Sequence, residues 1–140
     1  MKFWDASAII PLCVREPGSS LVRKIAEEDG AIVVWWTTPI ECYSAFARRR
    51  RDDIRMRANE DQARQAVARM AADWTEVQPS QQVRETAARV LLLHPLRAAD
   101  ALQLAAGLVW ANGHAARHHF VCLDERLRET AQREGFAVLP

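Results

Sequence analysis

The sequence lacks the features of several protein classes. It has three cysteines, too few and too widely spaced for a disulfide framework or a zinc knuckle: Cys13, Cys42 and Cys122. No apolar stretch approaches the roughly 20 residues of a membrane span. The segment Met1–Ile10 contains Asp5 and has no long apolar core, unlike a signal or transit peptide. We therefore expect a cytoplasmic protein with buried thiols and no membrane contact.

Lysine is also scarce, and arginine takes its place. Of the 19 basic residues, 17 are arginines, and six of these lie between Arg48 and Arg57, although the net charge is only +1. Guanidinium groups bind phosphates and carboxylates through paired hydrogen bonds. The run Arg48, Arg49, Arg50 and Arg51 therefore indicates an anionic partner, and a solvated helix end explains it equally well.

Length and patterning predict a single α/β domain. The 140 residues are 49% hydrophobic and 26% charged, which is typical of one globular domain spanning residues 1–140. Short apolar runs alternate with helical patterns, and this alternation predicts a three-layer α/β/α sandwich around a central, mostly parallel five-stranded sheet. The expected strands are Lys2–Trp4, Ala31–Trp36, Thr75–Gln78, His119–Cys122 and Ala137–Leu139.

Glycines mark the expected ends of three helices. We predict helices over about Ser19–Asp29, Leu96–Asn112 and Glu125–Glu134, each followed by a glycine in the left-handed conformation: Gly30, Gly113 and Gly135. Within the second of these, the segment 101–110 is apolar nearly all round and should be the most buried helix. Apolar residues at helical spacing predict two more helices, with core faces formed by Ala63, Ala66, Val67, Met70, Ala71 and Trp74, and by Val83, Ala87, Val90 and Leu91.

Four acidic residues lie at or near the expected carboxyl ends of strands, where parallel sheets bind ligands: Asp5, Glu41, Asp100 and Asp124. Each has an ordinary structural explanation, since Asp5 and Asp124 could be N-caps, Asp100 a first-turn acid, and Glu41 the partner of Thr38 in a capping box. Together, however, carboxylates in apolar surroundings raise one another's pKa unless a cation lies among them. Oxygen ligands of this kind select Mg²⁺ or Mn²⁺, and such a pocket favours phosphodiester chemistry.

Histidines and tryptophans are weaker candidates. We expect the four histidines to be surface or loop residues, because none lies at a predicted strand end with a carboxylate partner: His94, His114, His118 and His119. Trp35 and Trp36 could stack on nucleic-acid bases. Their position in a predicted strand places at least one of them in the core.

Four segments resemble the four acidic motifs of PIN domains, in the right order and across the whole chain: Phe3–Ile10, Thr38–Glu41 with the helix after it, Leu96–Ala105 and Val121–Leu127. The chain is most similar to the ribonuclease toxins of VapBC-type toxin–antitoxin systems. This resemblance implies one PIN-like nuclease domain, a metal-dependent endoribonuclease that hydrolyses RNA phosphodiester bonds with a metal-activated water. It also implies a homodimer, neutralised by a cognate antitoxin as in type II toxin–antitoxin pairs.

The resemblance also assigns roles to residues. Asp5, Glu41, Asp100 and Asp124 match the catalytic acids that hold Mg²⁺ or Mn²⁺. Ser7 matches a hydroxyl at the substrate, and an N-cap of its own helix is an equally good interpretation. Where the family often has threonine or serine, two residues before the fourth acid, this chain has Cys122. Two alternatives stay open: a catalytically weak PIN-like binding module, and a PIN-type nuclease that acts on other nucleic acid without an antitoxin.

Overall fold

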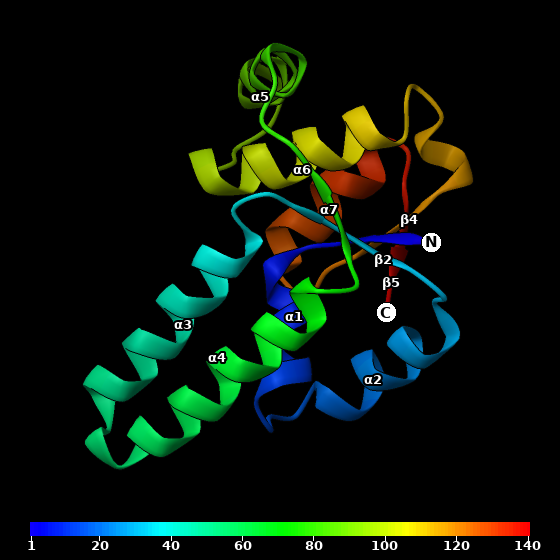
Figure 1. Cartoon of the computed structure of the whole chain (residues 1–140). Coiled ribbons are helices and arrows are strands. Elements are labelled where there is room, and N and C mark those ends of the chain that lie inside the picture. The colour runs from blue at the N-terminus through cyan, green and yellow to red at the C-terminus, as the bar shows by residue number, and fades with distance from the viewer.

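Five short apolar runs form the sheet, as their composition predicts. The computed structural model describes residues 1–140, and Figure 1 shows the strands between two layers of helices. The strands are β1 (Lys2–Trp4), β2 (Ile32–Trp35), β3 (Thr75–Val77), β4 (His119–Val121) and β5 (Ala137–Leu139). All pair in parallel in the order β3-β2-β1-β4-β5. The predicted three-layer α/β/α fold with a parallel five-stranded sheet is confirmed, and β1 is its central strand.

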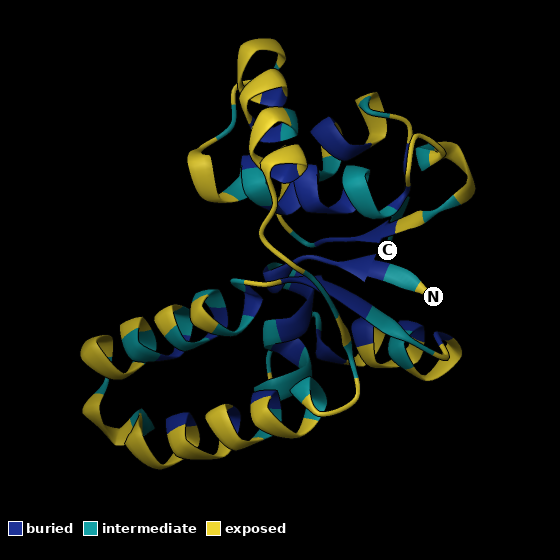
Figure 2. Cartoon of the chain, turned by 45° about the horizontal axis from the view of Figure 1, so that its top comes forward, coloured by how far each residue is buried: buried dark blue, intermediate teal, exposed yellow.

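Seven helices cover the two faces of the sheet. They are α1 (Ala6–Cys13), α2 (Ser19–Glu28), α3 (Thr38–Asp52), α4 (Arg57–Ala71), α5 (Gln81–Leu93), α6 (Ala98–Trp110) and α7 (Glu125–Arg133), with short 3₁₀ turns at Ile54–Met56 and Ala115–Arg117. The first four pack on one face and the last three on the other (Figure 1). In Figure 2 the buried residues gather on the strands and on the helix faces against them, while the outer parts of α3 and α4 are exposed.

The central strands are buried on both faces because successive side chains point to opposite sides of the sheet. Phe3 packs with α5, α6 and α7, and the next residue, Trp4, packs with α1 to α4. Phe120 and Val121 in β4 divide between the two faces in the same way. Helix α6 has six buried residues, more than any other helix, as its apolar sequence predicts.

Two helix boundaries and one predicted core residue differ from the prediction. Gly113 and Gly135 have positive φ, at 78° and 103°, as expected, but Gly30 does not. Helix α2 ends earlier, because Asp29 turns into an extended conformation and its carboxylate accepts a hydrogen bond from the Trp4 indole. Helix α6 begins at Ala98 rather than near Leu96. Leu91, predicted to be core, is 44% exposed, because the α5 face is completed by its neighbour Val90.

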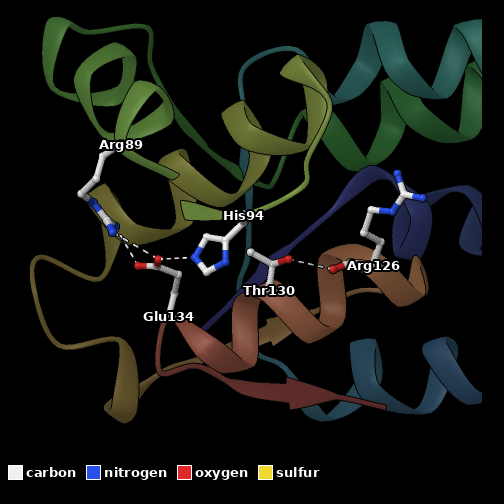
Figure 3. Close-up of polar contacts among 5 residues, drawn as sticks. All are labelled: Arg89, His94, Arg126, Thr130 and Glu134. Carbon is white, nitrogen blue, oxygen red and sulfur yellow. Dashed lines mark hydrogen bonds and ion pairs between the residues drawn. The ribbon is translucent and has the colours of Figure 1, made fainter. Parts of the chain in front are cut away.

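One of the loop histidines, His94, has a carboxylate partner that the sequence does not predict. The Nε2 atom of His94 lies 2.7 Å from Oε1 of Glu134, and Arg89 donates two hydrogen bonds to the same carboxylate (Figure 3). The cluster joins the end of α5 to the end of α7. The sequence does not reveal this partner, because residues 94 and 134 are brought together only by the packing of the two helices.

Gly107 in α6 allows a close approach between that helix and the sheet. A methyl group at this position would lie 2.9 Å from Cε2 of Phe120 and 3.4 Å from Cδ1 of Phe3. Both rings are fully buried and stack with centroids 5.1 Å apart, so neither has room to move. We expect Gly107→Ala to cost about 1–3 kcal/mol of overpacking, less the roughly 1 kcal/mol that alanine gains over glycine in a helix.

Urea denaturation followed by circular dichroism measures this cost. The control is Gly30→Ala, because the added methyl group there has nothing within 4 Å. It should change the free energy of unfolding by no more than about 0.5 kcal/mol. A Gly107→Ala protein as stable as the wild type would show that the aromatic pair does shift.

Candidate active site

All four predicted acids lie on the side of the sheet where the strands end. Asp5 directly follows β1, and Asp124 follows β4 as the N-cap of α7. Glu41 lies in the first turn of α3, after β2, and Asp100 lies in the first turn of α6. The parallel arrangement brings these ends to one edge of the sheet.

Asp5 is a buried carboxylate without a cationic partner. It is 4% exposed, and its Oδ2 accepts hydrogen bonds from the backbone N–H of Ser7 at 2.9 Å and from the Cys122 thiol at 3.5 Å. Burial raises the pKa of Asp5, these hydrogen bonds lower it in part, and repulsion from Asp100 raises it further. The net effect is a raised pKa, so the anion is poorly compensated.

Asp29 shows what a compensated carboxylate looks like in the same protein. It is also 4% exposed, but it accepts a hydrogen bond from Trp4 and lies 2.9 Å from the N-terminal ammonium and 3.5 Å from Lys2 Nζ. Burial alone would raise the pKa of Asp29, yet these partners lower it overall. Asp5 lies deeper in the protein than Asp29 and lacks a positive charge beside it, so the pKa values of the two carboxylates shift in opposite directions.

Glu41 is held in place by side chains rather than by a capping box. Helix α3 begins at Thr38, its N-cap is Thr37, and no side chain caps the backbone there, so the predicted capping box is wrong. Instead, the hydroxyl of Thr37 and the amide of Gln103 both donate to Oε1 of Glu41, at 2.8 and 3.0 Å. The carboxylate is thus free of the helix end and available to a ligand.

The pKa of Glu41 reflects the surrounding acids. Burial raises it, the hydrogen bonds from Thr37 and Gln103 lower it, and the charges of Asp5 and Asp100 raise it again, to about 7 from its ordinary 4.5. Burial is the largest cause of the raised pKa, and repulsion from the two neighbouring carboxylates adds to it. Glu41 is therefore half protonated near neutral pH when no cation is bound.

Asp100 and Asp124 line a common pocket of about 420 Å³ that has no apolar lining residue. Burial raises the pKa of Asp100, repulsion from Asp124 raises it further, and the charges of Arg97 and Arg126 lower it in part. Oδ1 of Asp124 accepts from the N–H of Leu127, so the predicted N-cap is confirmed. Asp5 and Glu41 are not among the lining residues of this pocket and interact with Asp100 from beside it.

Ser7 fastens α1 to the loop after β4. Its hydroxyl accepts hydrogen bonds from the N–H groups of Leu123 and Asp124, at 2.9 and 3.2 Å. The N-cap of α1 is Asp5, so the interpretation of Ser7 as its own N-cap is wrong. Both N–H groups belong to the segment that leads into α7, and Ser7 thereby positions Asp124 relative to Asp5.

The Cys122 thiol also belongs to this network. Its Sγ lies 3.5 Å from the Asp5 carboxylate and 3.5 Å from the carbonyl of Asp124. Burial raises the pKa of Cys122, and the charge of Asp5 raises it further. The thiol therefore stays protonated and donates weakly to Asp5.

The arginine run lies away from the acids, in the second half of α3. Arg48 and Arg51 follow Glu41 by seven and ten residues, which places them about 10 and 15 Å further along the helix axis. Arg49 forms an ion pair with Glu16, and Arg50 with Glu60. These two stabilise the packing of α3 against its neighbours, and only Arg48 and Arg51 are exposed without an ion pair.

Three residues beside the acids were not identified from the sequence. Arg97 and Arg126 line the pocket with Asp100, and the fully buried Gln103 orients Glu41. Trp36 is 51% exposed just after β2, while its neighbour Trp35 is 3% exposed and belongs to the core. A polar residue inside the apolar segment 101–110 was a signal for Gln103, but its partner is visible only in the fold.

The donor set suits a hard divalent cation. All four candidate ligands are carboxylates, and three of them have raised pKa values: Asp5, Glu41 and Asp100. The side chains do not close around one point, because no group of three or more His, Cys, Asp or Glu residues has the spacing of a complete metal cage. Mg²⁺ commonly takes only one or two carboxylates and keeps several waters, so this open arrangement fits that ion.

Comparison with known proteins identifies a similar fold. No protein-family model matches the chain, and no curated protein matches it. The structure is similar to the crystal structure of VapC20 of Mycobacterium tuberculosis, a toxin that cleaves the sarcin–ricin loop. The TM-score is 0.69 at 15% sequence identity, over 98% of this chain and 97% of that chain. The chain therefore has the PIN-like fold of a VapC toxin over its whole length.

No helix combines the length and apolar character needed to cross a membrane.

Proposed function

We propose that the protein is a metal-dependent endoribonuclease, the toxin of a type II toxin–antitoxin pair. The observation that carries the proposal is the set of carboxylates at the end of the sheet, where burial and mutual repulsion raise the pKa of Asp5, Glu41 and Asp100. Such a set is stabilised by Mg²⁺ or Mn²⁺. The similarity to a VapC toxin that cleaves RNA supports the same reaction.

Each side chain has a role in this proposal. Asp5 and Asp100 would hold the cation directly, Glu41 directly or through a water molecule, and Asp124 through a water molecule or at a second ion. When bound, the ion activates water for attack on phosphorus and stabilises the charge that develops in the transition state. Thr37 and Gln103 orient Glu41, and the Ser7 hydroxyl holds the loop that carries Asp124 near the substrate.

The proposal includes a protein partner, a homodimer and a cytoplasmic location. A pocket of about 240 Å³ lies among α1, α3 and α4, with apolar lining from Val14, Phe46 and Met56. We expect a helix of the antitoxin to insert an apolar side chain there, and a basic side chain of the antitoxin to reach the acids through charge-assisted hydrogen bonds. Among the arginines of α3, Arg48 and Arg51 form no ion pair, so their guanidinium groups are available to bind RNA phosphates.

The ends of a cut RNA test the proposal directly. Hydrolysis by a metal-activated water should leave a 5′-phosphate and a 3′-hydroxyl. Attack by the RNA's own 2′-hydroxyl needs a positioned acid and base, and neither candidate pocket is lined by a histidine. Mapping the termini of a single-stranded RNA cut in the presence of Mn²⁺ distinguishes the two. A 2′,3′-cyclic phosphate would refute the proposed mechanism, and binding of RNA without cleavage would favour the non-catalytic binding module.

A further inference from the structure

Two arginines border the acidic pocket without forming an ion pair. Arg97 precedes the first turn of α6, and Arg126 lies in the first turn of α7. Both line the 420 Å³ pocket together with Asp100, Asp124 and Glu125. Neither guanidinium lies within 4.0 Å of a carboxylate oxygen or donates a hydrogen bond, although the charges of both act on Asp100.

The contrast with the other arginines near acids is informative. Arg89 binds Glu134 through both terminal nitrogens, at 3.1 and 2.7 Å. Figure 3 also shows a separate hydrogen bond, in which the backbone carbonyl of Arg126 accepts from the Thr130 hydroxyl. The Arg126 side chain extends away from Thr130 in the same view. Its guanidinium donors are therefore free for a ligand.

We propose that Arg97 and Arg126 bind the RNA phosphate next to the scissile bond and offset the repulsion of the carboxylates. This inference rests on the proposed function and names the substrate contacts of that site. A guanidinium presents five N–H donors in a planar fork that matches phosphate oxygens. The lining charges of the pocket are two arginines against three acids, so the arginines reduce the repulsion that a phosphodiester meets there.

The N-terminus of α6 also favours a phosphate group in this pocket. Helix α6 begins without a side-chain cap, so its first N–H groups face solvent or a ligand. Those N–H groups, and the positive end of the helix, favour an anion at that position. The pocket volume lies within the range of about 300–1,000 Å³ that is usual for small-ligand sites. A phosphate group with one flanking sugar has room there.

The test is the salt dependence of RNA cleavage by the full chain. Cleavage of a fluorescent single-stranded RNA in Mn²⁺ gives kcat and KM over a series of KCl concentrations for the wild type, Arg97→Gln, Arg126→Gln and the double variant. Each lost phosphate contact should lower the slope of log(kcat/KM) against log[KCl] by about 0.7. The loss should fall mainly on KM, because a positioning contact binds ground state and transition state alike.

The matched control is Arg23→Gln, an exposed arginine of α2 on the other face of the sheet with no ion pair. Slopes for the Arg97 and Arg126 variants that equal the control would overturn the inference. If the slope falls only in the double variant Arg48→Gln/Arg51→Gln, the RNA backbone follows α3 instead. The inference then fails while the proposed function stands. A wild-type protein that cuts no RNA refutes both, and is recognised before any variant is made.

Discussion

Replacing Asp5 with asparagine should abolish RNA cleavage while the protein stays folded. Asparagine is as good an N-cap as aspartate, so α1 keeps the acceptor that Ser7 N–H uses, and the side chain has the same size. The change removes only the negative charge at the centre of the sheet edge. Loss of a direct metal ligand should reduce the cleavage rate by more than the roughly 10–100-fold that is typical of mutations behind the ligands.

The control for Asp5→Asn is Asp29→Asn. Both aspartates are 4% exposed, so each substitution neutralises a side chain with little access to solvent. Asp29 faces Trp4, Lys2 and the N-terminal ammonium, so its neutralisation should lower stability. It should leave cleavage per folded molecule unchanged. Thermal unfolding and the initial rate of RNA cleavage separate the two effects, and full activity in Asp5→Asn would remove Asp5 from the site.

Much of the fold was predictable because it depends on local periodicity. Apolar runs of three to six residues specified the five strands, and the three-layer parallel architecture followed from their alternation with helices. The acids at the strand ends were predictable for the same reason, since a parallel sheet brings its carboxyl ends to one edge. Gly30 shows the limit, because a tertiary contact of Asp29 overrode the usual end of a helix.

The surroundings of the acids were less predictable because they depend on contacts far apart in sequence. Gln103 reaches Glu41 across 62 positions, and Cys122 reaches Asp5 across 117. The run Arg48–Arg51 drew attention by composition, yet Arg49 and Arg50 are held by distant glutamates. Arg97 and Arg126 do not belong to a run, so composition did not point to them. They line the pocket because they are close in sequence to Asp100 and Asp124.

Withdrawal of divalent cations should stop cleavage completely, and its effect on stability should depend on pH. Burial and the neighbouring acids raise the pKa of Glu41 to about 7, so between pH 4.5 and 7 the folded chain binds a proton that the unfolded chain has lost. Under the linkage relation, the metal-free protein therefore loses stability as the pH rises through this range. Asp5 and Asp100, whose pKa values are also raised, contribute with the same sign.

A bound cation reverses this trend, because it favours the ionised carboxylates and competes with protons for them. With EDTA, the melting temperature should fall from pH 5 to pH 7.5. With Mn²⁺ at about 100 times its Kd, the protein should gain about 2.7 kcal/mol at pH 7.5 and much less at pH 5.

Calorimetric titration with Mn²⁺ and thermal melts of wild type and Glu41→Gln measure both effects. The variant lacks the carboxylate of Glu41, so the part of the pH dependence that comes from Glu41 should disappear, while that of Asp5 and Asp100 remains. If Mn²⁺ stabilises the wild type equally at both pH values, or cleavage continues in EDTA, these carboxylates do not hold the catalytic ion.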